Sequence, residues 1–162
     1  MSVNRITGNT YIDGVLRALQ MILSDGCVND DAVAAGAAIQ STKLQHRHTK
    51  PVSQSGTAVA ETRIAHVAQA AGTVIAFKVG AIVACTGDAV VGINLLKNGV
   101  SVLAGGVELS AATDPYELIA GTVVTDDYVA GDVFTVDIAV DAGTGTLAEG
   151  VCADTVFDEA AT

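Results

Sequence analysis

The sequence predicts a mainly β protein, an antiparallel β-sandwich or jelly roll preceded by a short helical region and an extended arm. Half of the 162 residues are hydrophobic, and they are mostly Ala, Val and Ile rather than aromatic, which suits sheets packed face to face. Gly is abundant (17) and Pro scarce (2), so glycine makes most turns. From about residue 58, about eight strand-like segments follow one another without helices. We therefore expect an N-terminal region at 1–57 and a β body at 58–162.

The N-terminal region begins with a segment whose apolar residues recur three and four positions apart, which predicts an amphipathic helix over residues 10–26. Thr10 can cap its start and Gly26 can end it. A second, Ala-rich helical segment is expected over residues 30–44. One short helix cannot bury its apolar face alone, so that face needs the body, sister copies or another protein. The apolar face is formed by Ile12, Val15, Leu16, Leu19, Ile22 and Leu23.

A connecting arm is expected where helix gives way to sheet. Residues 49–57 are rich in Pro, Ser, Gln and Gly, a composition typical of a linker or extended arm. The charge balance changes there, because residues 1–50 carry five Lys or Arg against four Asp or Glu, whereas residues 51–162 carry three against fourteen. We interpret the basic side chains and histidines of "KLQHRHTKPVSQSG" (43–56) as polar contacts with a partner subunit or another surface.

The β body is predicted from alternating apolar residues and glycine turns. The clearest local signal is Asn98-Gly99, which lies between two apolar runs and predicts a type I′ hairpin. The remaining strands are expected at 62–70, 72–85, 106–111, 118–124, 131–141 and 150–159. Turns are expected at Gly87-Asp88, Asp114-Pro115, Gly131-Asp132 and Gly143 to Gly145.

Charge and composition argue against nucleic-acid binding, membrane insertion and disulfide bonds. The net charge of −10 is concentrated in the body and repels phosphate backbones, so no nucleic-acid partner is expected. The longest apolar-or-Gly run, at 32–39, is too short to span a bilayer, and no signal peptide is recognised, so we expect a soluble protein made in a cytoplasm. An odd number of cysteines without a CxxC pair predicts free, buried thiols at Cys27, Cys85 and Cys152.

The best metal candidate in the sequence is His46-x-His48. In a strand, residues i and i+2 share a face, so both imidazoles can reach one ion. The remaining ligands would come from His66 or from distant carboxylates, and a symmetric oligomer could gather copies of the pair on an axis. A solvated or interfacial polar segment explains the pair more simply. We therefore predict no metal and no cofactor.

Other chemistry has little support in the sequence. The acidic residues of the C-terminal half lack the DxDxDG loop of a calcium site, and a solvent-facing strand explains two of them. The serines lack a GxSxG context, the Gly-rich stretch 142–150 lacks the Gly-Lys of a phosphate loop, and the adjacent carboxylates Asp158 and Glu159 should point to opposite faces. We therefore expect no enzyme and no catalytic residues. The acidic residues considered as calcium ligands are Asp126, Asp127, Asp132, Asp137 and Asp141, and the serines considered as nucleophiles are Ser53, Ser55, Ser101 and Ser110.

Several segments together resemble small structural proteins of tailed-phage virions and prophages. They are "KLQHRH", "QSGTAVAETRIAHVAQAAGTVIAF", "GINLLKNGVSVLAG", "GDVFTVDIAV" and "GTGTLAEGVCADTVFDE", and they span roughly residues 39–159. The resemblance implies a β-sandwich or jelly-roll module with a strand–Lys–Asn–Gly–strand hairpin and an acidic last strand. It also implies a head-decoration, spike or fibre-type protein, often trimeric, that attaches to the shell through its N-terminal region.

We therefore expect a non-enzymatic phage virion structural protein, a homotrimeric capsid decoration (cement) or spike protein. Its expected partners are its own copies and the major capsid protein or another shell protein, with no nucleic acid and no membrane. It would lie on the virion surface after assembly in the host cytoplasm. The alternatives are a host- or glycan-binding module of a fibre or tail, a head–tail adaptor, and a small metal-dependent hydrolase using His46, His48 and His66.

Overall fold

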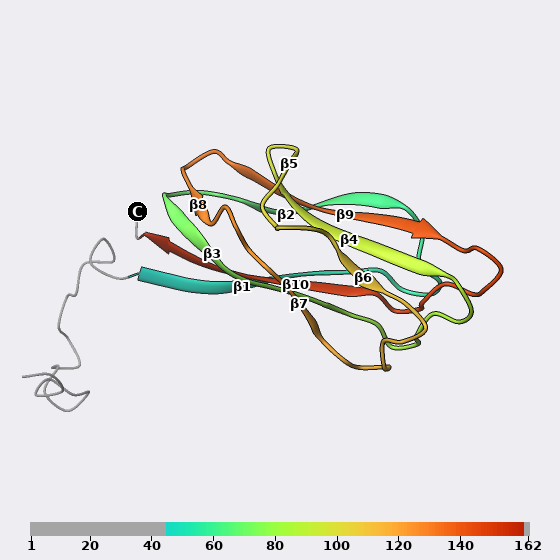
Figure 1. Ribbon diagram of the computed structural model, residues 1–162. Helices are drawn as coiled ribbons and strands as arrows, with labels where there is room; N and C mark the ends of the chain where they lie inside the picture. Colours follow the sequence, from blue (N-terminus) through green and yellow to red (C-terminus); the bar gives the residue numbers. More distant parts are fainter. Residues whose placement is uncertain (1–44, 161–162) are drawn as a thin grey trace, which may run out of the picture. The chain divides into compact units, whose positions relative to one another are not determined.

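Two antiparallel sheets pack face to face as a β-sandwich, which confirms the predicted fold class (Figure 1). The computed structural model describes residues 45–160. The predicted helices at 10–26 and 30–44, and Cys27, lie outside the described residues. Within residues 45–160 there is no helix that could cross a membrane.

Within residues 45–160, ten strands form the two sheets. The first sheet has the order β1 (Gln45–Ser53), β10 (Cys152–Ala160), β3 (Gly72–Gly80) and β7 (Ile119–Gly121), with β8 (Asp127–Tyr128) also paired to β3. The second sheet has the order β2 (Glu61–Val67), β9 (Val133–Asp141), β4 (Val90–Lys97) and β5 (Val100–Ser101), with β6 (Val107–Leu109) also paired to β4. Eight of these strands correspond to the eight expected, and the two additional ones are β1, in the segment predicted as an arm, and the two-residue β8.

The chain winds around the core, because β1, β2, β3 and β4 alternate between the two sheets, as do β9 and β10. The first and the last described strands are therefore neighbours. β1 pairs with β10 along its whole length, from Gln45 opposite Ala160 to Ser53 opposite Cys152. Residues from the two ends of the described chain consequently lie side by side (Figure 1).

The core lies between the sheets and is built mainly from small and β-branched side chains, as the composition predicts. All three phenylalanines are fully buried in it, with Phe77 on β3, Phe134 on β9 and Phe157 on β10. Burying one such side chain, or a Val, Ile or Leu, stabilises the fold by about 1.5–3 kcal/mol. The strict alternation of buried and less buried residues along β4 and β9 gives the inward faces of the second sheet.

The segment at 45–53 differs from the connecting arm that the sequence suggested. It is the edge strand β1, so the sandwich begins before residue 58. Val52 is buried, whereas the exposed Pro51 occupies an edge strand, where its missing N–H is tolerated. Because an edge strand exposes most of its side chains, it can carry the polar composition that is typical of a linker.

The predicted hairpin is confirmed between β4 and β5. Asn98 and Gly99 have φ angles of 50° and 83°, and positive φ at both central residues is what a type I′ turn requires. Gly87, Gly131 and Gly143, at the other glycine turns that the sequence indicates, also have positive φ. Glycine therefore sets the chain reversals of this Pro-poor protein.

We predict that Gly99→Val lowers the free energy of unfolding by about 1–2 kcal/mol, because a β-branched residue is strained in the left-handed region. A Cβ at residue 99 would meet no atom within 4 Å, so a loss of stability would come from backbone strain and not from a clash with neighbouring atoms. Urea unfolding measures it. Gly105→Val is the matched control, since its Cβ also enters open space but its φ is not positive. Equal stability of the two variants would contradict the turn assignment.

Candidate functional site

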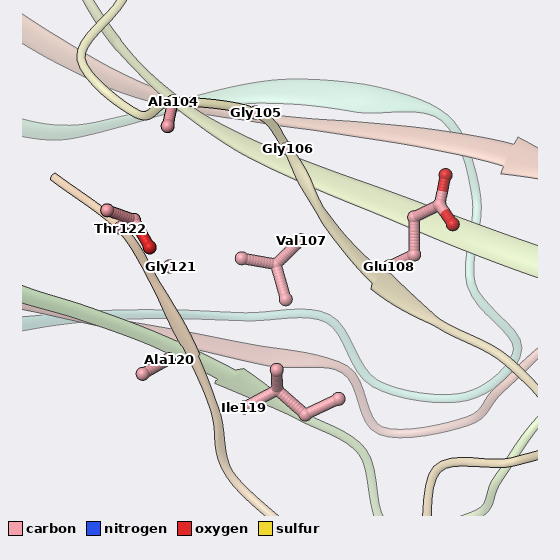
Figure 2. A pocket seen from close by; sticks show the side chains of 9 residues that line it. All are labelled: Ala104, Gly105, Gly106, Val107, Glu108, Ile119, Ala120, Gly121 and Thr122. Atoms are coloured by element: carbon pink, nitrogen blue, oxygen red, sulfur yellow. The ribbon is translucent and has the colours of Figure 1, made fainter. Parts of the chain in front are cut away.

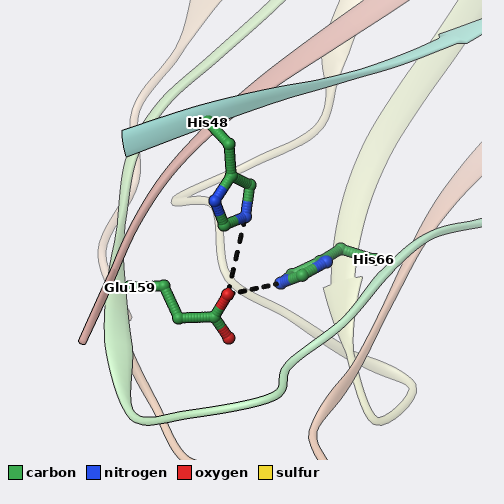
Figure 3. Close-up of side chains that lie close together, drawn as sticks. All are labelled: His48, His66 and Glu159. Atoms are coloured by element: carbon green, nitrogen blue, oxygen red, sulfur yellow. Dashed lines mark ion pairs between the residues drawn. The ribbon is translucent and has the colours of Figure 1, made fainter. Parts of the chain in front are cut away.

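One cluster of three metal-ligating side chains occurs within residues 45–160, and it joins His48, His66 and Glu159 (Figure 3). His48 comes from β1 and Glu159 from β10 of the first sheet, whereas His66 comes from β2 of the second. His48 lies opposite Phe157 in the β1–β10 pair, so its side chain is on the same face as Phe157 and Glu159. The cluster therefore bridges the two sheets near one end of the sandwich.

A β-bulge in β2 directs His66 into the cluster. The register of β2 with β9 shifts between Ile64 and His66. Regular alternation would put these two side chains on one face, yet Ile64 is 69% exposed and His66 is buried. The bulge lets two successive residues, Ala65 and His66, both pack toward the core.

The two imidazoles face the same carboxylate oxygen. His48 Nε2 lies 3.7 Å from Glu159 Oε2, and His66 Nε2 lies 3.6 Å from the same atom. The two rings contact each other edge to face, with centroids 5.0 Å apart. Both N–O separations are too long for good hydrogen bonds, so the three groups converge without being directly bonded.

Backbone donors hold the carboxylate of Glu159 in place. Its Oε1 accepts hydrogen bonds from the backbone N–H groups of Gln69, at 2.7 Å, and Ala70, at 3.0 Å. These donors belong to the connection between β2 and β3. They direct the other oxygen, Oε2, toward the two imidazoles (Figure 3).

The cluster is largely shielded from water by aromatic rings. The side chains of His66 and Glu159 are only 8% and 10% exposed, whereas that of His48 is 24% exposed. The ring of Phe157 lies 4.6 Å from that of His66 and 5.7 Å from that of His48, centroid to centroid. Phe134 and Tyr128 flank His66 as well. Electrostatic interactions are strengthened in such surroundings, and a bare charge is destabilised.

These surroundings set the protonation states. Burial lowers the pKa of His66; the negative charge of Glu159 opposes this, and the positive charges of His48 and Lys50 add to it. Burial raises the pKa of Glu159, but the N–H groups of Ala70 and Gln69, helped by both histidines, bring it below its usual value. Burial, with the charges of Glu159 and Asp158, raises the pKa of Tyr128 to about 12. At neutral pH the cluster therefore contains a neutral His66 and a charged Glu159.

The structure pairs the histidines differently from the sequence-based candidate. His46 and His48 share a face of β1, but His46 is exposed and is not part of the cluster. His66, the suggested third ligand, does join it. Glu159 was missed as a ligand, because only the pairing of the first and last strands brings it to His48. The predicted split between Asp158 and Glu159 is confirmed, since Asp158 points away and forms an ion pair of 3.1 Å with Arg47.

Three of the five acidic residues considered for calcium accept hydrogen bonds within the described part of the chain. Asp132 accepts hydrogen bonds from the Asn98 side chain and the Val129 N–H. Asp137 accepts one from the Thr62 hydroxyl, and Asp141 accepts one from the Gly143 N–H. The two residues on β9 face outward, as expected of a solvent-facing strand.

A shallow hollow of about 480 Å³ lies between the segments that contain β6 and β7 (Figure 2). Its polar side chains are the Glu108 carboxylate and the Thr122 hydroxyl, and the rest of its lining is glycine or apolar. The described lining offers neither an imidazole nor a thiol. Cys85 and Cys152 are free; Cys85 is buried, as predicted, and Cys152 is partly exposed.

Comparison with protein-family models gives no match, and comparison with curated proteins gives none either.

We predict that Glu159→Ala lowers the free energy of unfolding by about 1–3 kcal/mol, because it removes the charged acceptor of two backbone hydrogen bonds, from the N–H groups of Gln69 and Ala70. Urea unfolding in metal-free buffer measures the change. Glu108→Ala is the control, since Glu108 is exposed and its carboxylate accepts no hydrogen bond within the described part of the chain. A loss no larger than that of the control would show that the carboxylate does not organise this end of the sandwich.

Proposed function

We propose that the chain is a non-enzymatic structural protein of a phage virion, a homotrimeric capsid decoration (cement) or spike protein. The strand order of the two sheets supports this most directly. The orders β1-β10-β3-β7 and β2-β9-β4-β5, with the first and last strands adjacent, are those of a jelly roll, an architecture that viral capsid domains use. The resemblance of residues 39–159 to virion structural proteins supports the same proposal. Because a fold alone assigns no function, further support for this proposal must come from features of the surface.

Exposed apolar side chains support protein–protein contacts. Tyr116 is 79% exposed, and it lies beside Ile82 and Leu118, both more than half exposed, at one hollow of the surface. Val100 and Val129 are also largely exposed, elsewhere in the chain. Neighbouring subunits would remove such side chains from water, which favours assembly.

Open strand edges support self-association. In the described chain, β1 pairs only with β10 and β2 pairs only with β9, so each has a free edge. The edges lie close together, because Arg63 on β2 donates a hydrogen bond of 2.6 Å to the backbone oxygen of Ser53 on β1. A strand or arm of another copy can pair with such an edge through backbone hydrogen bonds.

The charge distribution favours a protein partner over nucleic acid. Fourteen acidic residues against three basic ones after residue 50 repel phosphate backbones. The partner in this proposal is the major capsid protein or another shell protein, contacted at the virion surface after assembly in the host cytoplasm. Many weak contacts add up on a particle that presents many copies of one site.

We predict that the purified chain has three times the 16.3 kDa mass of one subunit in light scattering. Antibodies against it should label the whole head surface of virions from the host that encodes it. A monomer, or a particle without label, would contradict the proposal. Label confined to the tail tip would favour a fibre module instead, and label at a single vertex would favour a head–tail adaptor.

We also predict that removing residues 1–38 preserves the thermal stability of the sandwich but abolishes binding to shells. The described core residues all lie between Val52 and Phe157, and β1 begins at Gln45. A longer deletion, of residues 1–50, would remove most of β1 and would confuse loss of attachment with loss of folding. Co-sedimentation with particles that lack the protein measures binding, with the full chain as control. Equal binding of both proteins would refute attachment through the N-terminal region.

A further inference from the structure

We propose that His48, His66 and Glu159 bind one divalent transition-metal ion, Zn²⁺ by the chemistry of the donors, and that the ion joins β1, β2 and β10. This goes beyond the proposed virion role, which requires no ion. The sequence alone predicted no metal site, because it could not show that Glu159 lies beside His48 and His66.

The donor atoms have nearly the spacing that an ion requires. Glu159 Oε2 lies 3.7 Å and 3.6 Å from the two Nε2 atoms, and one donor atom from each residue lies within 4.8 Å of the others. Around tetrahedral zinc, with bonds of about 2.0–2.2 Å, two ligand atoms are separated by about 3.3–3.6 Å. The distances from Glu159 Oε2 to the two imidazole nitrogens therefore need to change by only a few tenths of an ångström, whereas the imidazoles, whose donor atoms lie within 4.8 Å of each other, would have to approach by up to about 1 Å.

The two imidazole nitrogens need a partner. Both Nε2 atoms are buried, and neither has a hydrogen-bond partner within the described part of the chain. The His66 side chain is more than nine-tenths buried and points at Glu159 (Figure 3). A buried polar atom without a partner is destabilising, and a shared ion would satisfy both nitrogens and the oxygen together.

The surroundings of Glu159 resemble the support that metal ligands receive in proteins. Its Oε1 is fixed by the N–H groups of Gln69 and Ala70, which leaves Oε2 free to coordinate. The neutral imidazole and the ionised carboxylate are the forms of these side chains that bind metals.

The donor set selects the kind of ion. Two imidazoles and one carboxylate suit Zn²⁺, whereas Mg²⁺ and Ca²⁺ prefer oxygen ligands throughout. His48 is the most exposed of the three side chains, so solvent lies nearest to the cluster on the side of β1. The ion would connect the edge strand β1 and the last strand β10 to the opposite sheet, and it would stabilise the folded state because only that state assembles the donors.

The test uses the full, untagged chain after removal of metals with EDTA. Titration calorimetry with Zn²⁺ should give one ion per chain, and the melting temperature should rise by at least about 5 °C at a hundredfold excess of Zn²⁺ over its Kd. Mg²⁺ and Ca²⁺ at the same concentration should leave the melting temperature unchanged. Co²⁺ should give the intense visible absorption of tetrahedral coordination. Absence of saturable Zn²⁺ binding by the unaltered protein would overturn the proposal.

Substitutions assign the ligands. His48→Gln and Glu159→Gln should each weaken Zn²⁺ binding at least tenfold and abolish the tetrahedral Co²⁺ spectrum. The matched control is His46→Gln, because His46 shares the strand and face of His48 but is exposed and outside the cluster. Its affinity should equal that of the unaltered chain. Equal loss in the His46 and His48 variants, or retained affinity in Glu159→Gln, would overturn the proposal.

Discussion

The pairing of β1 with β10 is the constraint on which the rest of the structure depends. It joins the first and last described strands over nine residue pairs, and it completes the first sheet at its edge. The register places His48 opposite Phe157 and Arg47 opposite Asp158. On the inner face this brings an imidazole next to the aromatic core, and on the outer face it forms the Arg47–Asp158 ion pair. One backbone pairing thus sets both the closure of the sandwich and the position of the polar cluster.

The aromatic side chains of the core lie mainly around the His48–His66–Glu159 cluster. Most of the interior is Ala, Val, Ile and Leu, and three of the four buried aromatic rings, those of Phe134, Phe157 and Tyr128, gather at the end of the sandwich where the histidines lie. There Phe134, Phe157 and Tyr128 surround His66 and exclude water from it. Two buried imidazoles beside a buried carboxylate destabilise the folded state unless their polar atoms have partners. A bound ion would therefore stabilise the sandwich most at this end.

The sequence predicted the features that depend on local patterns. Alternation identified most of the long strands, and the Asn98-Gly99 dipeptide identified the hairpin. β1 was missed because an edge strand shows a polar, Pro-containing composition. Glu159 was missed as a partner of His48, because it reaches His48 only through pairing across the length of the chain. His66 was named as a possible ligand, but the bulge that turns it inward is not revealed by alternation.

Hydrogen–deuterium exchange of the peptide spanning residues 45–53 tests the β1–β10 pairing most directly. If β1 belongs to the sandwich, its amides that bond to β10 exchange as slowly as those of β10 itself and become exposed only when the sandwich unfolds. If residues 45–53 are an arm outside the sandwich, their amides exchange at the rate of an unstructured peptide while β3, β9 and β10 remain protected. That result would contradict the account of the fold and remove the basis for the His48–His66–Glu159 site.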